Sequence, residues 1–183
     1  MAFWDKLFGR EQKNNVSAAP TEIIEFHEER RLHPRVNARE GTRVLVIDDS
    51  ATVLAMFRKV LRSAGYVVIE AADAEKGLEL AHSEKPELIF LDIVLPGMNG
   101  FAALRRLRRD PQTEPIPVIM ISGNEQATEQ FFGARIGADD FMKKPFSREE
   151  LFARIERLLD DQQRPCRPEK AFIETPETGL RQS

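Results

Sequence analysis

Residues 43–49 read Arg-Val-Leu-Val-Ile-Asp-Asp, four consecutive apolar residues followed by two acids. An unbroken apolar run rich in Val and Ile is typical of a strand buried on both faces, as in parallel sheets covered by helices. Adjacent carboxylates repel each other and are costly to bury. The stretch therefore predicts a strand that ends at a cation site, with Asp48 and Asp49 as ligands.

The composition indicates one domain with tails. The chain has 183 residues, 42% hydrophobic and 31% charged, with a formal net charge of -3, so no overall field favours nucleic acid. The single cysteine, Cys166, cannot form an internal disulfide, which fits a reducing compartment. No apolar run reaches the roughly 18 residues of a membrane span. We therefore expect a cytoplasmic protein.

After residue 42, predicted strands and helices alternate. The strands are expected at 43–47, 66–71, 88–91, 118–121 and 139–142, and the helices at 50–64, 74–83, 101–109, 125–136 and 148–159. This alternation predicts an α/β fold, in which a parallel sheet carries helices on both faces. Ligands of such sheets bind at the carboxyl ends of the strands, where the strand order reverses.

Two flanking segments lack this alternation. Residues 1–41 are predicted to be an N-terminal extension with a basic linker, and residues 162–183 a disordered tail, because three prolines lie there among polar residues. Within residues 1–10, a short helix would gather four large apolar side chains on one face: Phe3, Trp4, Leu7 and Phe8. That face could dock on a membrane surface or a partner; a frayed end is the simpler alternative.

The predicted strand ends bring together five polar side chains, those of Asp48, Asp49, Asp92, Ser122 and Lys144. Three acids suit a hard cation such as Mg²⁺. The lysine and the hydroxyl could each contact a phosphoryl oxygen. Asp92 is the candidate nucleophile, because a carboxylate can accept a phosphoryl group and form an acyl phosphate.

These residues resemble the receiver domain of two-component response regulators. The resemblance covers residues 42–161 and implies a flavodoxin-like five-stranded parallel sheet with the strand order 2-1-3-4-5. Four motifs carry it, in the family's order: Asp48-Asp49, Asp92-Ile-Val-Leu-Pro-Gly-Met-Asn-Gly100, Ser122-Gly123 and Phe141-Met-Lys-Lys-Pro145.

The resemblance also implies a role for each site residue. Asp92 would accept a phosphoryl group from a sensor histidine kinase or a phosphotransfer protein, and the face formed by residues 125–159 would pass the signal to a downstream protein. Mg²⁺ would be held by Asp48, Asp49, Asp92 and the backbone carbonyl of Val94. Lys144, followed by a cis proline, would pair with the phosphoryl group, while Ser122 and Phe141 would change position.

Two positions depart from the most familiar family pattern. Phe141 has no hydroxyl, so packing alone would hold its inward position. Val94, two residues after the acceptor, has no polar group that could orient an attacking water. We therefore predict a comparatively long-lived acyl phosphate.

Three alternatives to the switch remain open. An Mg²⁺-dependent phosphohydrolase with an aspartate nucleophile usually has a second acid where this chain has Val94. The arginines at 30–35 resemble the motif that opens PilZ domains, so cyclic di-GMP could bind Arg30, Arg31 and Arg35, although the barrel and second motif of that family are absent. A phosphate sink or a localised scaffold is the third alternative.

The remaining basic cluster and the end of the chain support signalling by protein contact. Arg105, Arg106, Arg108 and Arg109 are predicted to form a solvated helix face. No DNA-binding domain is recognisable, and the residues after 161 are too few and too polar for an output domain. We therefore expect a stand-alone regulator, similar to those of chemotaxis and pilus motility, that does not turn over a substrate.

Overall fold

The computed structural model describes residues 36–123 and 137–168. Five parallel strands form one sheet in the order β2-β1-β3-β4-β5, which confirms the predicted fold and strand order. The strands are β1 (Arg43–Ile47), β2 (Val67–Ala71), β3 (Leu88–Asp92), β4 (Val118–Ser122) and β5 (Asp140–Lys143). The described helices are α1 (Ala51–Arg62), α2 (Ala74–Glu84), α3 (Gly100–Arg109) and α5 (Arg148–Glu156). The helix predicted at 125–136 lies outside the described residues.

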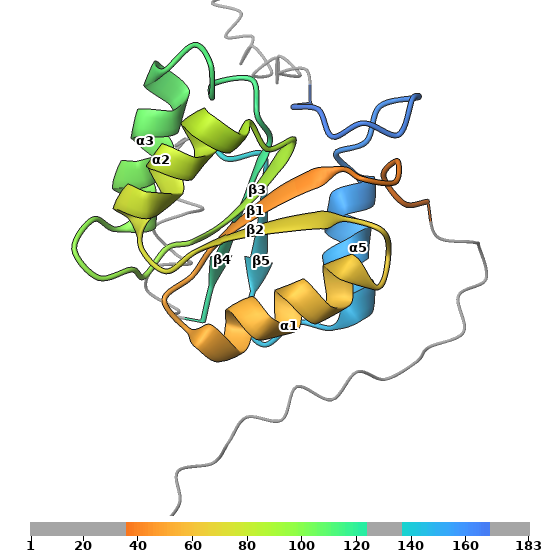
Figure 1. Ribbon diagram of the computed structural model, residues 1–183, viewed down its shortest axis with the longest axis horizontal. Coiled ribbons are helices and arrows are strands. Elements are labelled where there is room, and N and C mark those ends of the chain that lie inside the picture. Colours follow the sequence, from red (N-terminus) through yellow and green to blue (C-terminus); the bar gives the residue numbers. More distant parts are fainter. Residues whose placement is uncertain (1–35, 124–136, 169–183) are drawn as a thin grey trace, which may run out of the picture.

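The helices cover both faces of the sheet, α1 and α5 on one face and α2 and α3 on the other (Figure 1). Alternate residues of β1 supply the two cores: Val44 and Val46 pack in the layer with α1 and α5, while Leu45 and Ile47 pack in the layer with α2 and α3. The apolar run of β1 is thus buried on both faces, as the sequence predicts.

A polar side chain caps the start of each of the described helices. Ser50, Asp73, Asn99 and Ser147 each accept a hydrogen bond from the backbone N–H three residues later. These residue types are the usual N-caps, because a short side-chain oxygen satisfies an otherwise unpaired amide of the first turn. Two of the caps, Ser50 and Asn99, follow strand ends that carry the predicted site.

Several predicted element ends differ by one to three residues. Helix α5 ends at Glu156 rather than at residue 159, because the amides of Leu158 and Leu159 bond to carbonyls three residues earlier and Leu159 then pairs with Pro165. Strand β5 begins one residue later than predicted. The Val118 amide donates to the Asp139 carboxylate at 2.8 Å, so it does not donate to a backbone carbonyl of the neighbouring strand at this point.

Parts of both flanks pack against the domain, so the predicted disorder is wrong for residues 162–168. The Cys166 amide donates to the Leu158 carbonyl at 2.7 Å, and the Arg39 amide donates to the Gln163 carbonyl at 3.1 Å. The Ala38 amide donates to the Tyr66 hydroxyl at 3.1 Å. Backbone pairing therefore orders a segment whose composition alone favours disorder. The flanks beyond these ranges lie outside the described residues.

Candidate functional site

Three carboxylates meet at the carboxyl ends of two neighbouring strands. β1 and β3 pair in parallel with Ile47 opposite Leu91, so Asp48 and Asp92, the next residue of each chain segment, come side by side. Carboxylate oxygens of Asp48, Asp49 and Asp92 all lie within 4.8 Å of one another. Asp48 is completely buried, Asp92 is 5% exposed and Asp49 is exposed, so the cluster opens to solvent on the side of Asp49.

Lys144 bridges two of these carboxylates. Its Nζ donates to Asp48 Oδ2 at 2.6 Å and to Asp92 Oδ2 at 2.7 Å. The lysine follows β5 directly, its amide donates to the Ser122 carbonyl at 2.8 Å, and its bond to Pro145 is cis, as the resemblance implies. One ammonium group therefore partly neutralises two buried acids.

Burial and pairing act in opposite directions on these groups. Burial raises the pKa of Asp48 above its ordinary value and outweighs the opposing effects of the Lys144 ammonium and the Ser50 amide. Burial lowers the pKa of Lys144, but the hydrogen bonds and charges of Asp48 and Asp92 raise it by more, so the net pKa of Lys144 is raised. Lys144 therefore stays cationic in this buried setting.

A backbone amide donates to the second carboxylate oxygen of each of the two buried acids, Asp48 and Asp92. The Ser50 amide donates to Asp48 Oδ1 at 3.0 Å, and the Val94 amide donates to Asp92 Oδ1 at 3.1 Å. Each of these two carboxylates thus receives one amide and the shared ammonium. Val94 itself is 52% exposed, so an apolar side chain borders the site on its solvent side.

Gly100 lets α3 begin directly behind Asp92. A Cβ at this position would lie 2.1 Å from the backbone oxygen of Asp92, a distance that no side chain tolerates. The Gly100 amide donates to the Ile93 carbonyl at 2.9 Å, which closes the loop between β3 and α3. The sequence motif contains Gly100, but only the close backbone approach reveals its function.

The two predicted switch residues lie on β4 and β5. Ser122 is completely buried at the last position of β4, one residue beyond the pair formed by Asp92 and Ile121. Phe141 is 7% exposed and packs in the same core layer as α2 and α3. Asp48, Asp92, Ser122 and Lys144 therefore lie at one edge of the sheet, whereas Phe141 lies within β5, opposite Met120.

The donors at this edge fit a small hard cation. They are three carboxylates with no sulfur or imidazole among them, the type of donor that Mg²⁺ prefers, and the exposed Asp49 leaves access for metal-bound water. The Lys144 ammonium offsets part of the same negative charge.

The predicted solvated arginine face is wrong at one position. Arg105, Arg106 and Arg109 are exposed, but the side chain of Arg108 is only 12% exposed and forms an ion pair with Asp139 at 2.7 Å. The spacing contained the signal, because Arg108 follows the buried Leu104 by four residues and so lies on the same side of the helix. The candidate nucleotide ligands Arg30, Arg31 and Arg35, and residues 1–10, lie outside the described residues.

Comparisons with known proteins identify the family of this chain. The model of the response regulator receiver domain matches residues 44–156. PilH of Pseudomonas aeruginosa is 39% identical over 117 residues, which are 64% of this chain and 97% of PilH. The transcriptional regulator RpaA of Synechocystis is 43% identical over 117 residues, 64% of this chain but 48% of RpaA, so the chain spans about half the length of that relative.

Solved structures give the same assignment. The chemotaxis protein CheY4 of Vibrio cholerae is 30% identical with a TM-score of 0.60, and the match covers 65% of this chain and 99% of CheY4. A CheY-like receiver domain protein of Methanospirillum hungatei is also 30% identical, with a TM-score of 0.61 and coverage of 68% and 98%.

Within residues 36–123 and 137–168, no helix combines the length and the apolar composition that crossing a bilayer requires.

The matched family model spans more than half of the chain and includes all the strand-end residues described above. The chain therefore belongs to the response regulator receiver domain family, the phosphorylation-dependent switches of two-component signalling.

Proposed function

We propose that Asp92 is the phosphoacceptor of this receiver domain. The observation that carries the proposal is the position of its carboxylate, at a strand end beside two other acids and 2.7 Å from the Lys144 ammonium. A carboxylate oxygen of Asp92 would attack the phosphorus of a phosphohistidine, and the bond from phosphorus to the histidine nitrogen would break. The product is an acyl phosphate on Asp92 and a histidine whose nitrogen retains the electron pair.

The surrounding residues would prepare this transfer. Asp48, Asp49, Asp92 and the Val94 carbonyl would hold Mg²⁺, which supplies positive charge to the phosphoryl oxygens when it is bound. Lys144 would exchange one carboxylate partner for a phosphoryl oxygen, because its raised pKa keeps it charged. The Ser122 hydroxyl would donate to another phosphoryl oxygen.

The new charge would then bias a two-state equilibrium. Ser122, at the end of β4, and Phe141, within β5, would shift together, and the face formed by residues 125–159 would present the altered surface to a target protein. Phosphoryl donors would be a sensor histidine kinase or a phosphotransfer protein. The similarity to PilH over 97% of its length favours signalling by protein contact. We place the protein in the cytoplasm, where its single cysteine stays reduced.

Labelling with acetyl phosphate tests the acceptor. The Asp92→Asn variant should lose Mg²⁺-dependent labelling, while Asp49→Asn should need more Mg²⁺ and label more slowly. The exposed Asp161 offers a control of the same charge change, and Asp161→Asn should label as the wild type does. Undiminished labelling of Asp92→Asn would refute the proposal, and steady turnover of phosphate esters by the wild type would point to a phosphohydrolase instead.

The lifetime of the acyl phosphate is a separate property of the same site. Since the exposed Val94 has no group to orient water, we propose slow self-hydrolysis. A half-life of only seconds for the labelled wild type would contradict this part of the proposal.

A further inference from the structure

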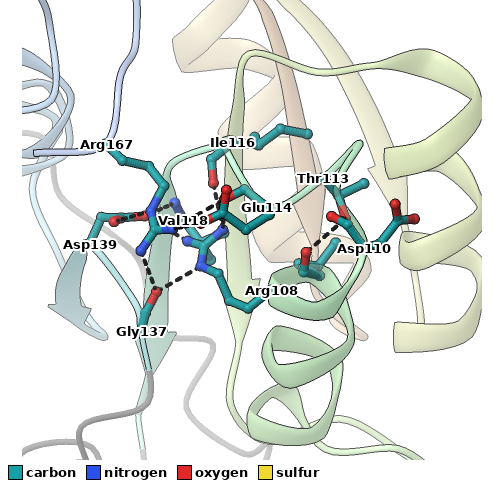
Figure 2. Close-up of polar contacts among 10 residues, drawn as sticks. Arg108, Asp110, Thr113, Glu114, Ile116, Val118, Gly137, Asp139 and Arg167 are labelled. Atoms are coloured by element: carbon teal, nitrogen blue, oxygen red, sulfur yellow. Dashed lines mark hydrogen bonds and ion pairs between the residues drawn. The ribbon is translucent and has the colours of Figure 1, made fainter.

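A C-terminal segment folds back after α5 and docks where β4 and β5 begin, at the edge of the sheet opposite the acidic cluster. We name residues 160–168 the strap. A turn around Asp160 reverses its direction: Asp160 Oδ1 accepts hydrogen bonds from the amides of Gln162 and Arg164, each at 2.9 Å. Near the end of the strap, the guanidinium of Arg167 reaches the loops before β4 and β5 (Figure 2).

Arg167 occupies a socket made by three residues. Its Nε donates to Asp139 Oδ1 at 2.8 Å, and its Nη1 donates to Glu114 Oε1 at 2.8 Å and to the Glu114 carbonyl at 3.2 Å. Its Nη2 lies 3.5 Å from the Gly137 carbonyl. Two carboxylates and two carbonyls around one planar cation form a site suited to a guanidinium, since its several donors match several acceptors at once.

Asp139 is the centre of this arrangement. Its side chain is 3% exposed; Oδ2 accepts from Arg108 at 2.7 Å and from the Val118 amide at 2.8 Å, which leaves Oδ1 for Arg167. Arg108 also donates to the carbonyls of Glu114, Ile116 and Gly137 (Figure 2). Arg167 therefore completes the hydrogen bonding of the buried Asp139 carboxylate. Without Arg167, Asp139 Oδ1 would lose this hydrogen bond.

The socket lies at the starts of the two strands whose ends carry the proposed switch. Val118, bound by Asp139, is the first residue of β4, and Ser122 is the last. Asp139 immediately precedes β5, and Lys144 immediately follows it. The two strands pair directly, from Ile119 opposite Asp140 to Ser122 opposite Lys143. A displacement of these strands at one end is therefore opposed by the socket at the other.

We infer that Arg167 is a latch that restrains β4 and β5 in the state without a phosphoryl group. This inference rests on the proposed function of Asp92. The contacts of the latch and the bridge from Lys144 to Asp48 and Asp92 occur in the same structure, at opposite ends of β4 and β5. Phosphorylation moves the two strands and loosens the strap, and loss of the strap contact makes the phosphorylated state easier to reach.

The coupling must be reciprocal, because both effects measure one free-energy difference. If a phosphoryl mimic lowers the equilibrium constant for strap docking by a given factor, removal of the latch raises the affinity for the mimic by the same factor. We expect about fivefold in each direction, at the lower end of the range for coupled sites.

The chain contains its own reporter of strap position. Cys166 is the only cysteine, and its neighbour in sequence is Arg167. Cys166 is half-buried and its amide donates to the Leu158 carbonyl, so release of the strap would expose its thiol further and speed its reaction with a thiol reagent. The full-length protein is treated with such a reagent at one fixed pH, with Mg²⁺ alone or with Mg²⁺ and beryllofluoride. Beryllofluoride should accelerate labelling of the wild type and leave Asp92→Asn unaffected.

The variants separate a latch from general destabilisation. Arg167→Ala should label rapidly without beryllofluoride and bind beryllofluoride more tightly in calorimetry, and Arg167→Lys should fall between it and the wild type. Arg157→Ala, which removes an exposed positive charge just before the strap, should match the wild type in both measurements.

Two results would overturn the latch while leaving the proposed function intact: beryllofluoride that binds without changing Cys166 labelling, or binding that is unchanged or weakened in Arg167→Ala. Failure of the wild type to bind beryllofluoride would instead overturn the proposed function, and the latch with it.

Discussion

Lys144 is the only cation that contacts the two buried carboxylates of the site among the described residues. Three acids with oxygens within 4.8 Å of one another repel strongly, and Asp48 has no access to solvent. Either an ammonium or a metal ion must offset that repulsion. Lys144 therefore has a stabilising role in the metal-free protein and a binding role toward a phosphoryl group.

Lys144→Met should separate these two roles. Without Mg²⁺, the variant should lose about 2 kcal/mol of unfolding free energy, less than a fully buried pair would cost, because a fifth of the Lys144 side chain is exposed. Mg²⁺ should then stabilise the variant more than the wild type, since the metal no longer shares the carboxylates with an ammonium. Urea unfolding in chelator and in Mg²⁺ measures both; equal stability of the two proteins in chelator would contradict this role.

At this scale the sequence predicted which acidic and basic side chains meet at the strand ends. Asp48, Asp92 and Lys144 follow predicted strands directly, and parallel strands carry their ends to one edge. It could not predict the pair of Arg167 and Asp139, because 28 residues separate them and neither falls in a periodic pattern. Nor could it show that Lys144 contacts Asp48 as well as Asp92.

Helix α3 begins so close to the backbone of Asp92 that position 100 has no room for a side chain. The Gly100 position faces the backbone oxygen of Asp92, and the amide of Gly100 holds the Ile93 carbonyl. Because the obstacle is backbone, a substitution must move either the start of α3 or the loop that carries Asp92 and Val94. The position of Asp92 is thus set by the packing of one helix against one loop.

Gly100→Ala should therefore damage labelling beyond its effect on stability. We expect the acetyl phosphate labelling rate to fall by about tenfold to a hundredfold, as for a reacting group misplaced by about 1 Å. Ala102→Gly, two residues further along α3, is the matched control: it should cost about 1 kcal/mol in helix stability and leave the labelling rate close to the wild type. Equal labelling by both variants would show that the loop adapts.

Element type was more predictable than element ends. Apolar runs and three- and four-residue spacings identified all the strands and all the helices in the described ranges. The ends were set by individual hydrogen bonds that no periodicity contains, such as the one from the Val118 amide to the Asp139 carboxylate before β5. Hydrogen bonding of this kind depends on which segments meet in space.

The domain extends beyond the limits that composition predicts. Leu159 pairs with Pro165, and Arg167 binds the almost fully buried Asp139, so the strap belongs to the folded unit. A segment rich in proline and charge looks disordered in sequence because it contributes little apolar surface. Its order comes from specific partners instead.

Shortening the chain tests this extension. A protein that ends at residue 161 should unfold with about 2–3 kcal/mol less free energy than one that ends at residue 168. The loss is smaller than for a fully buried pair, because Arg108 still neutralises Asp139 and Arg167 is itself 20% exposed. Chemical denaturation of the two proteins measures the difference, and coincident unfolding curves would show that the strap adds nothing.

The bond between the Arg39 amide and the Gln163 carbonyl brings the two flanks of the domain together. Arg39 precedes the start of β1, whereas Asp48 and Asp92 lie at the carboxyl ends of β1 and β3. The flanks therefore leave the domain from the edge of the sheet opposite the acidic site (Figure 1). A receiver tethered through either flank, to a surface or to a fused protein, would hold its acceptor outward, and a donor could approach without displacing the tether.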